Sequence, residues 1–370
     1  MVSDRLDRSV LGRWWRTVDP YLLASFSLLI LIGGLLVATA SPAVAHRIGK
    51  DSFHFIIWQF GFLALGIIIM FSISLFTPRT IRRLCVLGLF AGLALMIVVL
   101  FVGDETKGST RWINFAGLSI QPSEFLKPCF YVVTAWMFSE KLKNQDFPGF
   151  SISIALYLSV VVLLVLQPDI GTTITFTVVW AAMFFMAGLS VIFIMGFGVI
   201  AIIGGIAAYV FLPHVTARVD KFMSPDTTQN YQVTKSLEAF AHGGLFGRGP
   251  GEGIVKEHIP DSHTDFIFAV LGEEMGLVAV LLVIGLFAFI TIRVFTKLYK
   301  QNDTFTTLAS AGIIMNFALQ AIINMGVTLK LMPTKGMTLP FISYGGSSII
   351  ATSISVGILL ALTRKRYDLK

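Results

Sequence analysis

Ionisable side chains gather in one short segment of an otherwise apolar chain. Between Lys256 and Asp265, six of the ten residues titrate at accessible pH, and a strongly apolar run begins directly afterwards at Phe266. A carboxylate at the edge of such a run is partly desolvated, which raises its pKa towards that of a useful general base. Asp265 is therefore a candidate base. The same position also suits a helix N-cap, where aspartate is favoured, and the two roles can coexist.

Five further ionisable residues lie inside apolar runs or at their edges: Glu124, Lys127, Asp169, Glu273 and Glu274. Charges in such runs are costly to bury, so each of these residues is a candidate functional residue. Glu124 and Lys127 are three positions apart, which places them on one helix face as an ion pair. That pair either contributes to a site or only holds two helices together.

Two small-residue motifs carry weaker signals. The segment Gly247–Gly253 is glycine-rich, but no strand precedes it and no Gly-Lys-Ser/Thr follows it, so a flexible turn bearing Arg248 is favoured over a nucleotide-binding loop. The segment Ser343–Ser348 contains three serines but no Gly-x-Ser-x-Gly elbow. It indicates the start of a helix better than a serine nucleophile.

Two histidines raise the question of a metal site. His258 and His263 lie near Asp261 and Asp265, which leaves a divalent cation open as a cofactor. No His-Glu-x-x-His pattern accompanies them, and the two cysteines of the chain both lie in apolar runs. We therefore assign no metal ligand and no certain cofactor, and neither a disulfide framework nor a zinc cluster is supported.

The composition limits the kind of protein that positions these residues. The chain has 370 residues, of which 55% are hydrophobic and 13% charged, and its mean hydropathy is +0.80. Soluble domains carry roughly 25% charged residues. An integral membrane protein is therefore indicated, and a soluble enzyme, a disordered chain and a disulfide scaffold are disfavoured. We attribute the net charge of +7 to cytoplasmic loops and not to nucleic-acid binding.

Ten apolar segments approach the length of about 20 residues that a helix needs to cross a bilayer. They are residues 20–40, 54–76, 84–102, 122–139, 149–166, 171–187, 190–212, 266–292, 305–328 and 344–363. The short connection between the fifth and the sixth predicts a tight helical hairpin. The predicted fold class is an all-α integral membrane protein with about ten transmembrane helices and one large extracytoplasmic loop, residues 213–265.

The distribution of lysine and arginine orients these segments. With the N-terminus in the cytoplasm, the inner segments are about 29% basic and the outer segments about 11% basic. Both termini are therefore predicted to be cytoplasmic, and the ionisable residues of the apolar runs lie towards the outer face. We divide the chain into a cytoplasmic N-terminal tail, residues 1–19, and a single membrane domain, residues 20–370, which includes the loop 213–265.

Six motifs occur between residues 109 and 348: Ser109–Ile113, Gln121–Glu124, Gln167–Gly171, His263–Phe266, Gly272–Glu274 and Leu339–Ser348. In type and order they resemble the motifs of the SEDS family of bacterial cell-wall polymerases, and ten spans agree with the usual architecture of that family. Within the family, the run Pro333–Pro340 is similar to the cell-division branch and less so to the elongation branch.

The resemblance implies a peptidoglycan glycosyltransferase that polymerises lipid II at the outer leaflet during septal cell-wall synthesis. It implies that Asp265 is the essential aspartate and Glu257 a nearby functional glutamate, so both are expected catalytic residues. The residues that we expect to bind substrate are Arg111, Lys127, Asp169, Arg248, Lys256, His263 and Glu273.

The residues themselves agree with this chemistry. Polymerisation requires the 4-hydroxyl of one sugar to attack the anomeric carbon of another, which displaces a polyprenyl pyrophosphate. We expect Asp265 to act as the general base. We expect the cations Arg111, Lys127, Arg248 and Lys256 to stabilise charge on the departing pyrophosphate.

Two alternatives come from other functional classes. A lipid II flippase would carry polar residues along the whole crossing path, whereas this chain concentrates them towards the outer face. A non-catalytic divisome scaffold would use the outer loop only to recruit partners. The resemblance also implies a class B penicillin-binding protein (a transpeptidase) and other divisome proteins as partners. It places the chain in the bacterial inner membrane, enriched at the division septum.

Overall fold

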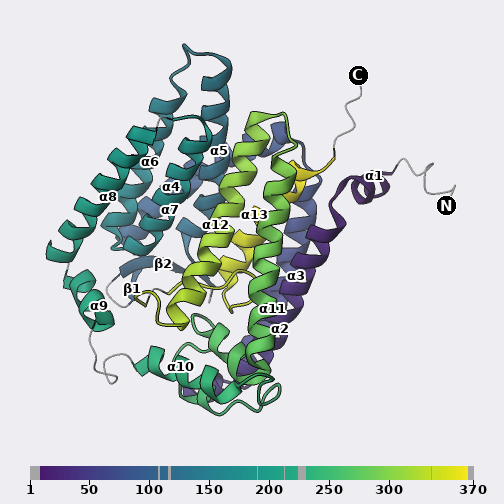
Figure 1. Ribbon diagram of the computed structural model, residues 1–370, viewed down its shortest axis with the longest axis vertical. Helices are drawn as coiled ribbons and strands as arrows, with labels where there is room; N and C mark the ends of the chain where they lie inside the picture. Colours follow the sequence, from purple (N-terminus) through teal and green to yellow (C-terminus); the bar gives the residue numbers. More distant parts are fainter. Residues whose placement is uncertain are drawn as a thin grey trace.

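The protein is a bundle of long helices in a computed structural model that describes residues 9–106, 109–115, 118–189, 191–211, 213–223, 231–334 and 336–365 (Figure 1). Helices occur at all ten predicted positions. They are α2 (Pro20–Arg47), α3 (His54–Ser74), α4 (Pro78–Val102), α5 (Pro122–Lys143), α6 (Gly149–Leu166), α7 (Ile170–Met186), α8 (Val191–Phe211), α11 (Ile267–Leu298), α12 (Thr304–Thr328) and α13 (Gly346–Thr363). The predicted helical membrane fold is confirmed, and the hairpin of α6 and α7 forms as expected.

Seven of these helices are long and apolar enough to cross a membrane: α2, α3, α4, α6, α11, α12 and α13. Of the other three, α5 carries Glu124 and Lys127, and α7 has only 17 residues. The first and the last described segments of the chain meet, because the backbone N–H of Lys365 donates to the carbonyl of Thr17 at 3.0 Å. An even number of crossings is therefore required. Ten satisfies this requirement, although the count of ten membrane crossings stays a prediction.

Several elements lie outside the predicted spans. At one end of the bundle, here called the loop end, lie α10 (Tyr231–Gly243), the 3-10 helix η2 (Val255–His258) and a sheet of β1 (Asp104–Thr106), β2 (Ser109–Phe115) and β3 (Leu118–Ile120). The sheet is antiparallel, in the order β1-β2-β3, and the sequence did not predict it. The helix α9 (Pro213–Met223) follows α8. The opposite end, here called the terminal end, carries α1 (Val10–Thr17), a helix within the predicted N-terminal tail.

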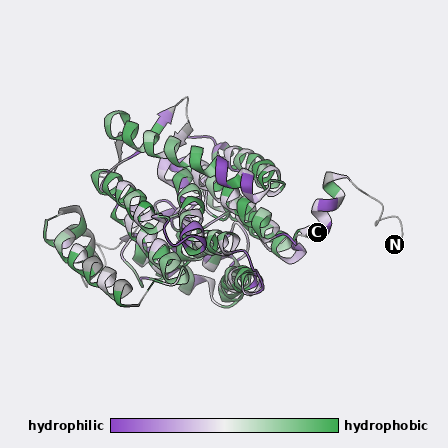
Figure 2. Ribbon diagram, turned by 90° about the horizontal axis from the view of Figure 1, so that it is seen from above, coloured by the Kyte–Doolittle hydropathy of each residue, from purple (hydrophilic) through white to green (hydrophobic). Residues whose placement is uncertain are grey.

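The core lies around α12 and α13. α12 packs against α5, α7, α11 and α13, and α13 packs most extensively against α3. About two thirds of the most apolar part of each of these two helices is buried inside the protein, whereas less than a third of the corresponding part of α3, α4 and α6 is buried. Seen along the bundle, the helices are coloured mainly as hydrophobic (Figure 2). The exposed apolar helices are the surface that a bilayer would cover.

Charges close the bundle at its terminal end. The carboxylate Oδ2 of Asp19, at the N-cap of α2, accepts from Arg293 Nη2 at 3.0 Å and lies 3.1 Å from Lys297 Nζ. Both cations belong to the last turns of α11. This cluster therefore ties the start of α2 to the end of α11.

The long helix α11 is two helices joined at Gly276, where φ is 75° and ψ is −178°. Every residue from Phe266 to Glu274 is buried, whereas apolar residues beyond the break are exposed, as with Leu282 at 70% and Ile292 at 64%. We predicted a single span from residue 266 that held Glu273 in the outer part of the membrane. Instead, α10 and η2 enclose the first part of α11 in protein, and the exposed apolar surface begins after Gly276.

The break leaves backbone groups that a continuous helix would pair, and the segment 244–249 pairs them. The N–H groups of Leu277 and Val278 donate to the carbonyls of Gly244 and Leu245 at 2.9 and 3.2 Å. In return, two N–H groups of the segment, those of Arg248 and Gly249, donate to the carbonyls of Glu273 and Glu274 at 3.0 and 2.9 Å. The glycine-rich segment is therefore an anchored part of the fold, and its interpretation as a flexible turn was wrong.

Gly276 should be intolerant of a side chain. A Cβ at this position would lie 2.3 Å from the amide nitrogen of Gly247 and 2.5 Å from the carbonyl oxygen of Leu245, at a positive φ that disfavours any L-residue. We expect Gly276→Ala to lower the free energy of unfolding by about 1–3 kcal/mol. Thermal unfolding of the purified protein in detergent measures this change.

A matched control exists in the same helix. A Cβ at Gly285 would meet open space, so Gly285→Ala should leave stability unchanged or raise it by up to about 1 kcal/mol. Equal melting temperatures for the two variants would show that the break at Gly276 is not a packed structural feature.

Candidate active site

Asp265 lies at the loop end, in a turn directly before α11, and its side chain is half-buried. The N-cap of α11 is Phe266, which makes no side-chain capping hydrogen bond. The alternative that Asp265 is the N-cap residue is therefore wrong, because the turn that precedes α11 runs one residue further than the sequence indicated. The candidate base is presented by a loop and not by a helix end.

Three hydrogen bonds hold the backbone of this loop against the segment 337–344. Asn324 of α12 donates from Nδ2 to the carbonyl of Asp265 at 2.9 Å and to the carbonyl of Met337 at 2.6 Å. Ser343 Oγ donates to the carbonyl of Thr264 at 2.6 Å, and the N–H of Tyr344 donates to the carbonyl of His263 at 2.8 Å. Three consecutive carbonyls, those of residues 263 to 265, are thus fixed from one side.

Gly336 stands beside the carboxylate itself. A Cβ built on Gly336 would lie 3.0 Å from Oδ2 of Asp265. The missing side chain allows the backbone to approach this closely, so the segment that braces the loop also forms one wall of the space around the carboxylate. Any side chain at residue 336 would crowd that space.

His263 is buried between two aromatic rings, with its centroid 4.6 Å from that of Phe55 and 5.2 Å from that of Tyr344. Burial lowers the pKa of His263 from 6.5 to about 4; Arg47 acts in the same direction, and Asp261 opposes it. The imidazole is therefore neutral at pH 7, and its Nδ1 makes no hydrogen bond. A neutral, apolar-packed histidine can shape the wall of a sugar site but supplies no positive charge there.

The acids of α11 hold η2 in place. Oε1 of Glu273 accepts from the N–H groups of Ile254 and Val255 at 2.8 and 2.7 Å, and Oε2 accepts from the N–H of Lys256 at 2.9 Å. The ammonium of Lys256 in turn contacts Glu274 and donates to the carbonyls of Thr39 and Gly251 at 3.0 and 2.9 Å. All three charged side chains are buried. These hydrogen bonds and the Lys256–Glu274 pair all join one part of the protein to another, so the three side chains hold η2 against α11.

Glu257 and Arg248, by contrast, are exposed at the same end. Glu257 belongs to η2, whose backbone is held by Glu273. The Nε of Arg248 donates to the carbonyl of His242 at 3.1 Å, and its backbone is fixed against α11. Both side chains therefore project from a rigid base into the space outside the bundle.

Arg111 and Asp169 form a second charged group, which the sheet positions. Nη1 of Arg111 lies 3.4 Å from Oδ1 of Asp169, which also caps α7 by accepting from the N–H of Thr172 at 3.1 Å. Next to them, Ser109 Oγ donates to the carbonyl of Pro168 at 3.2 Å. The strand β2 is thus attached to the start of α7. Arg111 remains 20% exposed, whereas Asp169 is buried.

The segment 343–348 joins the two charged groups. Its first two residues bind the Asp265 loop, as described above, and Ser347 Oγ donates to the carbonyl of Ser119 in β3 at 2.7 Å and accepts from the N–H of Gln121 at 3.2 Å. The same segment starts α13 at Gly346, with Gly345 as its N-cap, so its interpretation as a helix start is confirmed. Motifs that lie more than 200 positions apart in the sequence therefore meet at the loop end.

The predicted ion pair of α5 is confirmed. Lys127 Nζ lies 2.5 Å from Oε1 of Glu124, and Lys127 is only 1% exposed. The neighbouring Tyr131 donates to Asn316 of α12 at 3.1 Å. Lys127 therefore lies in the interior of the bundle with its charge already balanced.

The described residues at the loop end do not form an evident metal site. In the part of the chain that the structure describes, no three histidine, cysteine, aspartate or glutamate side chains gather closely enough to hold one. Of the two histidines that raised the question, His263 is enclosed by aromatic rings, whereas His258 is exposed and its Nδ1 lies 3.4 Å from the carbonyl of Ile254. The described residues offer positive charge through arginine and lysine.

Sequence reasoning missed Asn324 and Gly336. Asn324 is 1% exposed, and it is a polar residue within an apolar helix, which is the signal that would have identified it. Gly336 carries no such signal. It matters because its backbone lies close to the carboxylate of Asp265, and only the fold brings the two residues together.

The sequence and the fold both match known proteins. The family profile described as cell cycle protein, which covers FtsW, RodA and SpoVE, matches residues 20–368. A protein named probable peptidoglycan glycosyltransferase FtsW from Caulobacter vibrioides is 47% identical over 363 residues, which cover 98% of this chain and 93% of that protein. A protein of the same name from Escherichia coli is 34% identical and covers 98% of this chain and 91% of its own length.

Solved structures share the architecture. A chain from a peptidoglycan synthase complex that coordinates polymerization and crosslinking aligns with a TM-score of 0.79 and 27% identity, over 95% of this chain and 99% of that chain. The rod shape determining protein RodA of Thermus thermophilus aligns with a TM-score of 0.69 and 26% identity, over 96% of this chain and 99% of its own.

The buried state of His263 predicts a dependence of stability on pH. Its pKa is about 4 in the folded protein and about 6.5 when unfolded, so the unfolded state binds the extra proton between these values. Stability should be complete above pH 6.5 and fall by up to about 3 kcal/mol as the pH drops to 4. His263→Phe, which keeps the ring stacking, should remove this part of the acid loss in thermal unfolding measured across pH.

A second variant controls for the removal of a histidine from this loop. His258→Gln, made at an exposed position, should retain the acid loss of the wild type. An unchanged acid profile in His263→Phe would contradict the assignment of a neutral, buried imidazole.

Proposed function

Because this chain belongs to the FtsW/RodA/SpoVE family of cell cycle proteins, we propose that it is a peptidoglycan glycosyltransferase that polymerises lipid II at the outer face of the bacterial cytoplasmic membrane. The observation that carries the proposal is the 47% identity, over 98% of the chain, to a protein named peptidoglycan glycosyltransferase FtsW. The structure adds a carboxylate in a braced loop at one end of a membrane bundle. Septal synthesis follows from the similarity to FtsW.

The reaction needs a base for the attacking sugar hydroxyl, and Asp265 is the proposed base. It is half-buried, and the backbone around it is fixed by Asn324 and Ser343, so its carboxylate has little freedom to move away from a bound acceptor. Proton removal by a positioned carboxylate contributes about 10²–10⁴-fold to the rate. Glu257, on η2, is proposed as a second functional acid at the same end.

Positive charge for the departing pyrophosphate is proposed to come from Arg111 and Arg248, whose side chains are partly or fully exposed at the loop end. Lys127 and Lys256, which we also expected to bind substrate, are buried and paired with Glu124 and Glu274. Separating a buried lysine from its carboxylate partner costs free energy, because it leaves a buried charge without a partner. These two lysines are proposed to preserve the shape of the site, with Glu273 beside them.

The position of the charged groups favours an enzyme over a flippase. A flippase needs a polar path along its whole length. Here Asp265, Glu257 and Arg248 all lie at the loop end, and the exposed surfaces of α3 and α4 are apolar. Glycan synthesis by the purified protein in detergent, where no membrane has to be crossed, would separate polymerisation from both flipping and scaffolding.

Orientation and partners are proposed on the same basis. The excess of lysine and arginine places both ends of the chain, with α1, in the cytoplasm and the loop end outside. The chain is then one membrane domain preceded by a short cytoplasmic tail. A class B penicillin-binding protein is the proposed partner, supported by the likeness to a synthase complex that combines polymerization with crosslinking. Other divisome proteins and enrichment at the septum follow from the likeness to FtsW.

Replacing the base should abolish most activity without unfolding the protein. We expect Asp265→Asn to lower the rate of lipid II polymerisation by about 10²–10⁴-fold, because the amide cannot accept the proton. The substitution keeps the shape of the side chain, so the melting temperature should stay close to that of the wild type. Glycan strands made by the purified protein, with and without its transpeptidase partner, provide the measurement.

Asp261→Asn is the matched control, since Asp261 lies four residues away in the same loop and has a φ of 58°, which asparagine tolerates. It should retain most of the activity. A folded Asp265→Asn protein that polymerises lipid II at the wild-type rate would rule out Asp265 as the base.

A further inference from the structure

An apolar groove of about 300 Å³ lies between α2 and α3 in the half of the bundle near the terminal end. The side chains that line it include Leu23, Ile30 and Leu31 of α2 and Ile67, Met70 and Phe71 of α3. Its stretch along α2, from Leu23 to Leu31, corresponds to about 12 Å of helix. These dimensions and this lining suit part of a hydrocarbon chain.

Trp14 of α1 closes the terminal end of this groove. Its indole Nε1 donates to Ser74 Oγ at 2.8 Å, and its ring meets Phe71 edge-on at a centroid distance of 4.9 Å. Ser74 Oγ in turn donates to the carbonyl of Phe71 at 2.6 Å. The polar groups at this end are thus satisfied within the protein, and the groove offers a ligand only apolar contacts there.

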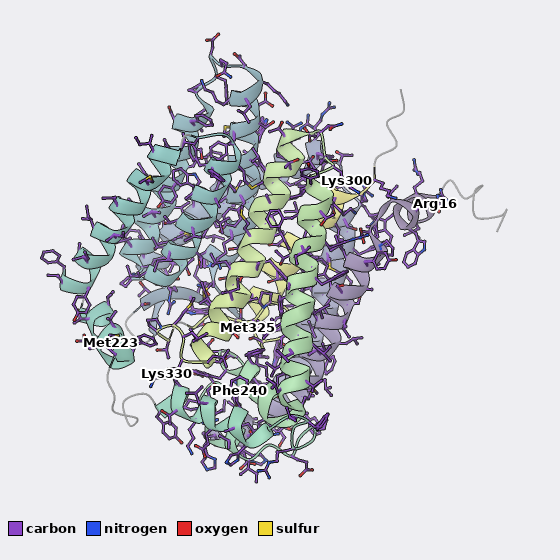
Figure 3. All side chains as sticks on the ribbon, in the orientation of Figure 1. Arg16, Met223, Phe240, Lys300, Met325 and Lys330 are labelled. Atoms are coloured by element: carbon purple, nitrogen blue, oxygen red, sulfur yellow. The ribbon has the colours of Figure 1, made fainter. Side chains whose placement is uncertain are left out.

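The helix α1 has the composition of a helix that lies in a membrane interface. Leu11 and Trp15 are apolar and exposed, at 60% and 67%. Arg13 and Arg16 are exposed on the same short helix, and Figure 3 labels Arg16 at the terminal end. Exposed tryptophan is typical of the headgroup level of a bilayer, and arginine on such a helix attracts anionic lipids. Figure 2 shows both hydrophilic and hydrophobic residues on α1.

We propose that α1 and the groove form a binding site for one anionic phospholipid of the leaflet at the terminal end. One acyl chain lies in the groove against Met70 and Phe71, with Trp14 at the terminal end of the groove. The phosphate headgroup binds Arg13 and Arg16. The apolar lining excludes a sugar or a polar peptide as the occupant. The two arginines favour an anionic headgroup over a zwitterionic one.

The first experiment measures lipid binding by native mass spectrometry of the purified protein. Phosphatidylglycerol and phosphatidylcholine with identical acyl chains are titrated separately, and we expect one tightly held phosphatidylglycerol. The double variant Arg13→Gln/Arg16→Gln should bind it roughly 20- to 30-fold more weakly, since each arginine near the surface contributes about fivefold. Phosphatidylcholine binding should not change. Arg79→Gln/Arg83→Gln removes two exposed arginines near the start of α4 and should leave both lipids unaffected.

The second experiment tests the acyl-chain half of the site. Ser27 lines the groove and is exposed, so Ser27→Trp fills the groove without disturbing the core and should weaken phosphatidylglycerol binding. Phosphatidylglycerol brominated on its acyl chains should quench the tryptophan fluorescence of the wild type more than that of Trp14→Phe, because Trp14 lines the groove.

The proposal is overturned by equal affinities for the two lipids, or by binding that the Arg13/Arg16 variant leaves unchanged. It is also overturned by headgroup-dependent binding that Ser27→Trp does not weaken, because the groove would then be unoccupied. Each variant changes exposed or groove-lining residues at the terminal end. Lipid II polymerisation by the same proteins therefore tests the proposed function of the loop end separately from lipid binding.

Discussion

The loop end of this molecule depends on one constraint, which is that every buried backbone donor and acceptor needs a partner. The break of α11 at Gly276 exposes such groups, and the segment 244–249 pairs them. The amides of η2 converge on Glu273, and the carbonyls of residues 263–265 receive donors from the segment 337–344 and Asn324. Satisfying the backbone therefore produces a rigid loop, and that loop presents Asp265.

Buried charged side chains, like buried backbone groups, need partners. Some of the residues that we expected to bind substrate are therefore paired within the protein. Buried charges are stable only when paired, so Lys256 lies against Glu274 and Lys127 against Glu124. Arg111 and Arg248 remain partly or fully exposed at the loop end, and they are the cations that we propose for an anionic substrate. The buried charges are therefore explained by the fold, and only the exposed ones enter the proposed chemistry.

Much of this could be predicted from the sequence, because apolar length and charge placement are local properties. The ten helices, the Glu124–Lys127 pair and the start of α13 are of this kind. The break at Gly276 could not be predicted, since the surrounding residues form one apolar pattern and the partners of the break lie in the segment 244–249 after α10. The role of Gly336 could not be predicted for the same reason, because its contact with Asp265 joins residues about 70 positions apart. Asn324 did carry a signal, as a polar residue in an apolar helix, but its partner Asp265 lies about 60 positions away and is known only from the fold.

The central claim is that the contacts around residues 263–265 act through the carboxylate of Asp265, and a double-mutant cycle on lipid II polymerisation tests it most directly. Asn324→Ala removes the hydrogen bond to the carbonyl of Asp265. It should lower the polymerisation rate in the wild-type background but cause little further loss in the Asp265→Asn background. An equal loss in both backgrounds would contradict the account, because Asn324 would then act independently of the proposed base.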